Sequence, residues 1–372
     1  MRFRVHAALC ALLACAPDQT PQAGPPPVAA AQDWAPLEIL GARVAPGERR
    51  ELRAVVSEGF SGGRLATPVV VVRGPRPGPT LCLTGGIHGD EVNGIEIVRR
   101  SLELLEPQDL AGTLVAVPIA NLHGFRRSSR YLPDRRDLNR HFPGRPDGSA
   151  ASRIAHRLFD GVVRHCEALV DFHAGSFHRR NLPQVRGDLG RPEVLEVALG
   201  FGTPAVVHHA GLRGTLRRAA VEAGIPAITY EAGQPMEFEE DEVRRGVEGV
   251  RSLMARLRMT AGSAEAAPPE LYYRARWVRA DDGGLLHASV GLGEEVRAGQ
   301  VLGSIIDPLS SERTPLLSPW SGRVIGMAVN QVVIPGFAAF HVGIDGERPS
   351  ARRGADPIAE GEEALEVGER PE

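Results

Sequence analysis

The chain contains no lysine, and all 43 of its basic residues are arginine. This absence excludes chemistry that needs a lysine amine: the Walker A loop, Schiff-base and pyridoxal enzymes, and biotinyl or lipoyl carriers. Cysteine is scarce as well. The four cysteines form no CxxC pair and no zinc-ribbon spacing, so cysteine is not expected to carry the chemistry. Cys82 lies in the apolar run TLCLTG and is interpreted as a core residue, because free cysteine packs like a small hydrophobe.

A strong net charge is also lacking. The formal charge is −3 over 372 residues, so no global basic field exists to hold a nucleic acid, and we expect no nucleic-acid partner. No apolar run approaches the roughly 20 residues of a membrane span. The hydrophobic content of 42% is ample for a packed core, and the length allows one large domain and a smaller one.

The N-terminus carries two arginines and then a short apolar run that ends in LLAC. This pattern predicts a secretory signal of the lipoprotein type, with the protein exported and lipid-anchored to the cell envelope through Cys15. Residues 1–35 would then comprise the signal and a Pro- and Ala-rich tether. Because the apolar run is short and interrupted by His6, the alternative is a cytoplasmic protein with a misassigned start codon.

Residues 36–262 alternate β-branched runs with amphipathic stretches. This alternation predicts an α/β domain with a mixed central sheet flanked by helices, in which functional sites lie at the carboxyl ends of strands. The expected strands are 68–74, 80–85, 112–120, 167–175, 203–209 and 226–233. The expected helices are 91–105, 149–163, 215–224 and 241–257.

The rest of the chain has a different pattern. Residues 261–269 are small residues and prolines, typical of a linker, and short apolar runs between Gly and Pro turns follow. They predict a small all-β, barrel-like domain over 263–348. Residues 349–372 are acidic and turn-rich, and a disordered tail is expected there.

The stretch LTGGIHGDEVNGIEIV, residues 83–98, joins an expected strand to an expected helix and contains His88 and Glu91. Gly86 and Gly89 do not give the GxGxxG spacing of a phosphate-binding turn. The three-residue offset can bring the imidazole and the carboxylate to one point, and zinc binds both ligand types. By itself HxxE is a weak signal, since most such pairs bind nothing.

A catalytic zinc ion keeps three protein ligands, so a third is required. The best candidate is His173 in ALVDFHAGS, at the carboxyl end of an apolar strand. A lone histidine there is more often bonded to backbone, but a neighbouring His88 turn would change that balance. The other histidines have no matched partner spacing and are interpreted as structural or solvent-facing.

Two further stretches hold candidate site residues. The loop RYLPDRRDLNRHFPG is either a basic surface loop or, near a metal, a binding site for a negative substrate, because guanidinium groups bind carboxylates. In that second case Asp137 could accept the other N–H of His88. Glu231 in GIPAITYEAGQ follows a buried strand, where a carboxylate is costly unless it is paired or catalytic. At a zinc site Glu231 would be the general base.

In this order, GGIHGDE, DLNRHFPG, DFHAG and TYEAG resemble the succinylglutamate desuccinylase/aspartoacylase family, the deacylase branch of the carboxypeptidase A-like zinc hydrolases. The resemblance covers roughly residues 40–345. It implies a zinc carboxypeptidase-like fold and a single zinc ion. The implied zinc ligands are His88, Glu91 and His173.

The resemblance also implies roles for other residues. Glu231 would be the general base, and Arg130 would polarise the scissile carbonyl and steady the oxyanion. Arg135 or Arg136 could fill the latter role instead, because the loop is about two residues longer than in some relatives. Asn139 and Arg140 would bind the carboxylate of the substrate.

The implied activity is zinc-dependent hydrolysis of a non-peptide amide bond in a small N-acyl amino acid or related N-acyl amine. The alternative is a zinc carboxypeptidase or amidase that acts on short or cell-wall peptides. A catalytically silent binding protein is disfavoured, because a receptor has no use for the complete acid/base set. GEEVRAGQVLG and SPWSGRVIG also resemble a biotinyl or lipoyl module, but no lysine is available to modify. That module is therefore expected to be structural or a wall of the substrate entrance.

Two expectations concern local structure and assembly. The glycines of the 83–98 stretch are interpreted as what lets the backbone turn sharply enough for His88 and Glu91 to meet. Asp90 and Asn93 are expected to cap the helix that starts there. The sequence leaves open whether the chain forms a homo-oligomer.

Overall fold

The computed structural model describes residues 34–58, 62–262, 267–329 and 331–344. The predicted signal segment with its lipidation site and the predicted acidic tail lie almost wholly outside these residues. No helix within the described ranges is both long and apolar enough to span a bilayer.

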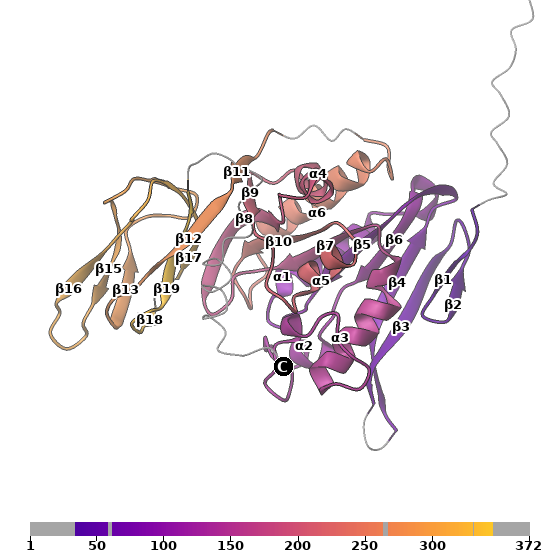
Figure 1. The fold of residues 1–372 in the computed structure, drawn as a ribbon, viewed down its shortest axis with the longest axis horizontal. Helices are drawn as coiled ribbons and strands as arrows, with labels where there is room; N and C mark the ends of the chain where they lie inside the picture. Colours follow the sequence, from indigo (N-terminus) through magenta and orange to yellow (C-terminus); the bar gives the residue numbers. More distant parts are fainter. Residues whose placement is uncertain (1–33, 59–61, 263–266, 330, 345–372) are drawn as a thin grey trace, which may run out of the picture. The chain divides into compact units, whose positions relative to one another are not determined.

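Nineteen strands and six α-helices make up the described part of the chain (Figure 1). The strands are β1 (Leu37–Ile39), β2 (Ala42–Val44), β3 (Arg49–Glu58), β4 (Arg64–Arg73), β5 (Arg76–Gly85), β6 (Ala111–Val117), β7 (Ala168–His173), β8 (Arg179–Gly187), β9 (Ala205–His208), β10 (Ala227–Gly233), β11 (Glu270–Tyr272), β12 (Arg274–Arg279), β13 (Gly284–Ala288), β14 (Glu295–Val296), β15 (Val301–Ile306), β16 (Arg313–Leu317), β17 (Gly322–Ala328), β18 (Val332–Val333) and β19 (Ala338–Ile344). The helices are α1 (Val92–Glu103), α2 (Leu122–Phe125), α3 (Ala150–Gly161), α4 (Pro192–Phe201), α5 (Leu216–Glu222) and α6 (Glu240–Arg256), with 3-10 turns at Pro107–Asp109, Leu138–Arg140 and Val163–His165.

A 13-stranded mixed sheet forms the centre of the fold, in the order β12-β19-β17-β8-β10-β7-β5-β6-β4-β3 with three strands off this path. Strands β10, β7, β5 and β6 run parallel, while β8 and β4 are antiparallel to the parallel group on either side. The predicted mixed sheet flanked by helices is therefore confirmed. The parallel strands are buried on both faces, which explains their continuous apolar runs in the sequence.

Each expected strand and helix of the α/β region is present, with ends that differ by a few residues. Six strands and α-helices of this region had no prediction: the short elements β1, β2 and α2, and the longer elements β3, β8 and α4. Strand β8 has the sequence RRNLPQVRG, whose arginines and proline do not give a strand pattern. It becomes a strand because β10 and β17 pair with it from either side.

Helix α6 packs against both α1 and α4, and all three helices contact strands of the sheet. An aromatic cluster fills the space between them and the strands: the ring of Phe201 on α4 lies 6.1 Å from Phe172 of β7 and 5.1 Å from Tyr230 of β10. Helix α3 contacts β3, and α5 contacts β7 and β10 (Figure 1). These contacts fix the strands whose ends carry the candidate site.

Cys82 is buried as predicted, but it is not a free cysteine. It forms a disulfide with Cys166, with the two Cα atoms 5.6 Å apart. Cys82 lies in β5 and Cys166 lies two residues before β7. The sequence separation of 84 residues gave no indication of this pairing, which requires β5 and β7 to be neighbours in the sheet.

The C-terminal strands divide between two sheets. Strands β12, β17 and β19 extend the large sheet, because β17 pairs with β8. Strands β16, β15, β13 and β18 form a separate four-stranded sheet. An apolar core that includes Val278, Leu286 and Phe340 lies in this region. The all-β prediction for this part of the chain is thus consistent with its strands, while closure into a barrel and the domain boundary stay predictions.

Candidate active site

His88 and Glu91 lie in the turn between β5 and α1, at the carboxyl end of a central strand. Two glycines shape this turn. Gly86 has φ of +60°, a conformation that glycine adopts without steric cost. Gly89 lies so close to α2 that a Cβ atom there would be 2.0 Å from the carbonyl carbon of Gly124. The interpretation that glycines allow the sharp turn therefore agrees with the backbone.

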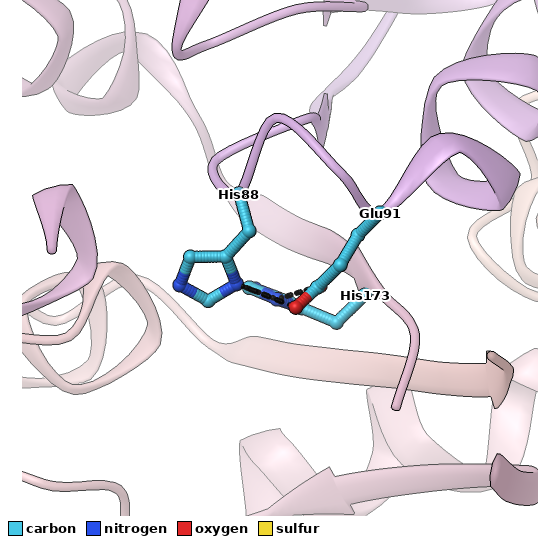
Figure 2. A group of neighbouring side chains, drawn as sticks. All are labelled: His88, Glu91 and His173. Atoms are coloured by element: carbon cyan, nitrogen blue, oxygen red, sulfur yellow. Dashed lines mark hydrogen bonds and ion pairs between the residues drawn. The ribbon is translucent and has the colours of Figure 1, made fainter. Parts of the chain in front are cut away.

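The structure brings His88, Glu91 and His173 together (Figure 2). His173 is the last residue of β7, and Glu91 Oε1 and Oε2 lie 2.8 Å from His88 Nδ1 and His173 Nδ1, respectively. The two Nδ1 atoms are 3.2 Å apart. All three side chains are buried, and their potential ligand atoms lie within 4.8 Å of one another. Two imidazoles and a carboxylate that converge in this way are a donor set that zinc accepts.

A second carboxylate contacts the other ring nitrogen, Nε2, of each histidine. Asp137 Oδ1 lies 3.1 Å from His88 Nε2, as the sequence suggested, and Asp171 Oδ2 lies 2.8 Å from His173 Nε2. Thr84 in turn donates to Asp171 Oδ1 at 2.7 Å. An N–H on each Nε2 leaves the Nδ1 lone pairs directed at the common point, the arrangement that orients histidine ligands of metals. This geometry supports the fit of a metal to the group.

Sequence analysis missed Asp171. Its signal was present in the spacing Asp-x-His of DFH, because alternate residues of a strand face the same side. When an aspartate lies two residues before a histidine at the end of a buried strand, the histidine therefore has a candidate hydrogen-bond partner on the same face.

In this cluster, burial and the neighbouring opposite charges shift the pKa values in opposite directions. Burial lowers the pKa of His173, but Asp171 and Glu91 outweigh it, and the pKa lies well above its ordinary value. For His88, burial and Arg130 lower the pKa, and Glu91 and Asp137 raise it above the ordinary value overall. Burial raises the pKa of Glu91, yet the two histidines hold it well below its usual range. Because a metal must compete with protons here, its affinity should weaken as the pH falls.

The capping prediction for α1 is wrong. The N-cap residue is Glu91, and no side chain caps the helix by a hydrogen bond. Asn93 instead binds the loop after β10: its Oδ1 accepts from the Glu239 backbone N–H at 3.0 Å and its Nδ2 donates to Glu239 Oε2 at 3.2 Å. The backbone carbonyl of Asp90 accepts from Met236 N in the same loop. These contacts connect the turn and the start of α1 to the loop after β10.

Of the three arginines considered for the carbonyl-polarising role, Arg130 lines the pocket and the other two do not. Its Nη2 donates to Asp137 Oδ2 at 2.8 Å, and its Nη1 lies 3.2 Å from Glu91 Oε1 and 2.7 Å from Ser176 Oγ. Arg135 is exposed, and Arg136 pairs with Asp134 outside the pocket.

Asn139 and Arg140 also line the pocket, at the 3-10 turn that follows Asp137. Asn139 Oδ1 accepts from the backbone N–H of Leu216 at 2.8 Å, so this side chain also holds the first turn of α5 in place. The guanidinium of Arg140 donates to the Asn139 backbone carbonyl at 2.9 Å.

Glu231 lies in β10 directly opposite His173 in the parallel β7–β10 register. Its carboxylate is held by two β8 residues that the sequence did not indicate: Asn181 Nδ2 donates to Oε2 at 2.9 Å, and Arg186 Nη1 lies 3.6 Å from Oε1. Both face the pocket. No sequence signal identified them, because β8 itself was not recognised.

The pocket also contains side chains from other parts of the chain. Arg179 of β8, Arg217 of α5 and Trp277 of β12 were not predicted. Trp277 places β12 in the wall of the pocket. None of the described pocket residues belongs to GEEVRAGQVLG or SPWSGRVIG, so the expected role of that module, structural or a wall of the substrate entrance, stays a prediction. Lining residues include five arginines, which are Arg130, Arg140, Arg179, Arg186 and Arg217.

The fold is that of an α/β protein, and polar side chains gather at the carboxyl ends of its parallel strands β5, β7 and β10. Such folds bind ligands at this edge of the sheet, so the group is a candidate active site. Residues 77–257, which contain all four motifs, belong to the succinylglutamate desuccinylase/aspartoacylase family, since they match the family model for the "Succinylglutamate desuccinylase/Aspartoacylase catalytic domain". The resemblance inferred from the four motifs is thereby confirmed.

Individual relatives agree with this assignment. The chain is 29% identical over 267 residues to an N-alpha-acetyl-L-2,4-diaminobutyric acid deacetylase from Halomonas elongata, over 68% of this chain and 78% of the relative. It is 28% identical to a succinylglutamate desuccinylase/aspartoacylase structure from Rhodobacter sphaeroides, with a TM-score of 0.73 over 80% of this chain and 96% of that one. The product-bound ectoine utilization protein EutE from Ruegeria pomeroyi shares the fold at 23% identity, with a TM-score of 0.73 over 81% and 98% of the two chains.

Proposed function

We propose that this protein is a zinc-dependent hydrolase that cleaves the amide bond of a small N-acyl amino acid or related N-acyl amine. The observation that carries the proposal is the buried His88–Glu91–His173 group with Glu231 on the neighbouring strand, all in one pocket. The family contains deacylases, and the Halomonas elongata relative is named for removing an acetyl group from an amino acid.

His88, Glu91 and His173 would hold the zinc ion, because their donor atoms converge and Asp137 and Asp171 orient the two rings. When bound, zinc would act as a Lewis acid that polarises the amide carbonyl and lowers the pKa of water.

Glu231 would take a proton from the attacking water and pass it to the leaving nitrogen. The water oxygen adds to the amide carbon, the carbon–nitrogen bond breaks, and a carboxylic acid and a free amine are formed. Arg130 would donate to the carbonyl oxygen as negative charge develops on it. A preorganised donor of this kind contributes on the order of 10²- to 10³-fold to the rate.

The arginines of the pocket support a substrate that carries a carboxylate. Five arginines and two glutamates line it, so its protein lining is positively charged overall. Asn139 and Arg140 would bind the substrate carboxylate, since a guanidinium donates two parallel hydrogen bonds to such a group.

The direct test is metal analysis of the purified protein, combined with a panel of N-acetyl and N-succinyl amino acids and short peptides. We expect about one zinc ion per chain and release of a free amino acid from the acyl compounds. Glu231→Gln should keep its zinc and lose roughly 10²- to 10⁴-fold in kcat. Glu237→Gln, an exposed change in the loop after β10, is the matched control. Absence of zinc, or undiminished activity of Glu231→Gln, would contradict the mechanism, and hydrolysis of peptides alone would favour the peptidase alternative.

We also propose that the protein is exported and anchored through Cys15. The Cys82–Cys166 disulfide supports export, because such bonds persist in oxidising compartments and are rare in the cytosol. Mass spectrometry of the native protein tests the proposal: a lipidated Cys15 at the N-terminus is expected, and an unprocessed Met1 would refute it.

A further inference from the structure

Strand β8 lies between the strand that carries Glu231 and the C-terminal strands. Asn181 of β8 pairs with Gly233 of β10 on one side and with Gly326 of β17 on the other. Its side chain is buried, and its Nδ2 donates to Glu231 Oε2 at 2.9 Å. Asn181 is thus a direct connection between the proposed general base and the C-terminal region.

The position of the Asn181 amide depends on the absence of a side chain at residue 326. A Cβ atom on Gly326 would lie 2.8 Å from Asn181 Oδ1, closer than such atoms approach in proteins, and 3.3 Å from the Cβ of His341. It would also lie 3.7 Å from Cη2 of Trp277, whose ring stacks on His341 with centroids 4.6 Å apart. The C-terminal strands therefore enclose the amide closely.

A hydrogen bond to Glu231 matters because the last torsion of a glutamate side chain is broad. Without a donor, the carboxylate can rotate among several orientations, and a general base must lie within hydrogen-bond reach of the proton that it removes. Asn181 fixes Oε2, which restricts the direction of Oε1. Arg186 Nη1 lies 3.6 Å from Oε1, beyond hydrogen-bond distance, so Asn181 makes the closer contact of the two.

We propose that Asn181 is a positioning residue for Glu231, and that the C-terminal strand β17 keeps the Asn181 amide in place because residue 326 is glycine. This inference rests on the proposed function, in which Glu231 is the general base. It gives the C-terminal region a part in turnover, in addition to forming a wall of the pocket.

The test is a double-mutant cycle of Asn181→Ala and Gly326→Ala, assayed on the best substrate of the acyl panel. Each single variant should lose about 10-fold or more in kcat, with KM and zinc content close to wild type, because a charged hydrogen bond is lost or displaced. If Gly326 acts through Asn181, the double variant should be no worse than Asn181→Ala alone. A merely structural effect of the added methyl group would multiply the two losses instead.

Gly291→Ala is the control for adding a methyl group to a C-terminal glycine, since the nearest atom to its Cβ would be Glu294 Oε2 at 4.0 Å. Crystal structures supply a readout that needs no substrate: Gly326→Ala should show Asn181 Nδ2 beyond hydrogen-bond distance of Glu231 Oε2. Asn181→Ala removes atoms, so it tests the positioning role even if Gly326→Ala does not fold.

Wild-type kcat in either single variant, multiplied losses in the double variant, or an undisturbed Asn181–Glu231 contact in Gly326→Ala would overturn the inference. An inactive wild-type protein would count against the proposed function, and the crystal structures would still decide whether Gly326 controls Asn181.

Discussion

Residues 34–262 and residues 270–344 contribute different side chains to the same pocket. The first region supplies every candidate metal ligand, the proposed base and all five lining arginines, from strand ends and the loops beside them. Among the described lining residues, the second region contributes Trp277. Charged groups are buried in the first region, where those of the candidate site form ion pairs, whereas the core of the second is apolar.

The difference follows from strand geometry. Parallel strands end at a common edge, so residues far apart in sequence can converge there. The antiparallel strands β17, β19 and β12 extend the same sheet, and β12 reaches the pocket through Trp277. The candidate catalytic residues thus lie in residues 34–262, while residues 270–344 contribute to the wall of the pocket.

Removal of the proposed zinc ion should have the largest effect and should separate the two regions. Dialysis against a chelator should abolish activity and lower Tm, because a ligand at 1,000 times its Kd stabilises the folded state by about 4 kcal/mol. Amide hydrogen exchange should increase around His88 and His173 and not in residues 270–344. Added zinc should restore both properties. An equal increase in exchange across both regions would contradict this division.

Arg130→Ala should lower kcat by on the order of 10²- to 10³-fold, because a preorganised donor to the carbonyl oxygen is lost. Zinc content, measured by elemental analysis, should stay near wild type, since the three candidate ligands remain. Arg136→Ala is the matched control, because that side chain pairs with Asp134 outside the pocket. If Arg136→Ala lost the activity instead, the role would belong to Arg136.

Loss of the disulfide should affect stability more than catalysis. Cys82→Ala/Cys166→Ala should lower the free energy of unfolding by about 2–4 kcal/mol, because the closed loop restricts the unfolded chain. Urea unfolding measures this change, and kcat should change little because neither cysteine lines the pocket. Reduction of the wild-type protein should give the same loss. If the reductant has no effect and both thiols can be alkylated in the untreated protein, the bond is not formed.

Trp277→Leu should have the smallest effect and should act on substrate binding. Trp277 lines the pocket, so its replacement should remove a contact with the substrate; a contact of about 0.5–1.5 kcal/mol corresponds to a KM up to about tenfold higher. Steady-state kinetics on the acyl panel measures this. Trp320→Leu, which alters another tryptophan at the C-terminal core, is the control. Equal changes in both variants would mean that the C-terminal region affects binding only through its stability.

The sequence was sufficient to predict the parallel strands and the candidate ligands. The runs around Cys82, Val170 and Ile228 are largely apolar because their strands are buried on both faces, and a charged residue or a histidine at the end of such a run is conspicuous. His88, Glu91, His173 and Glu231 could therefore be identified before the fold was known.

Other members of the site could not be identified in this way. Asn181 and Arg186 belong to β8, whose local pattern does not indicate a strand. Its conformation depends on pairing with β10 and β17, which are distant in sequence. The capping prediction failed for a related reason: Asn93 finds its partner in the loop after β10, which is distant in sequence.

By itself, the sequence determined which side-chain types are available for chemistry and how strands and helices alternate, because composition and periodicity can be read without knowledge of the fold. Tertiary structure alone decided that Cys82 meets Cys166, that Asp171 supports His173, and that Gly326 encloses the amide next to Glu231. These contacts depend on strand order and register. Both are set by the packing of the whole sheet, and no short stretch of sequence specifies them.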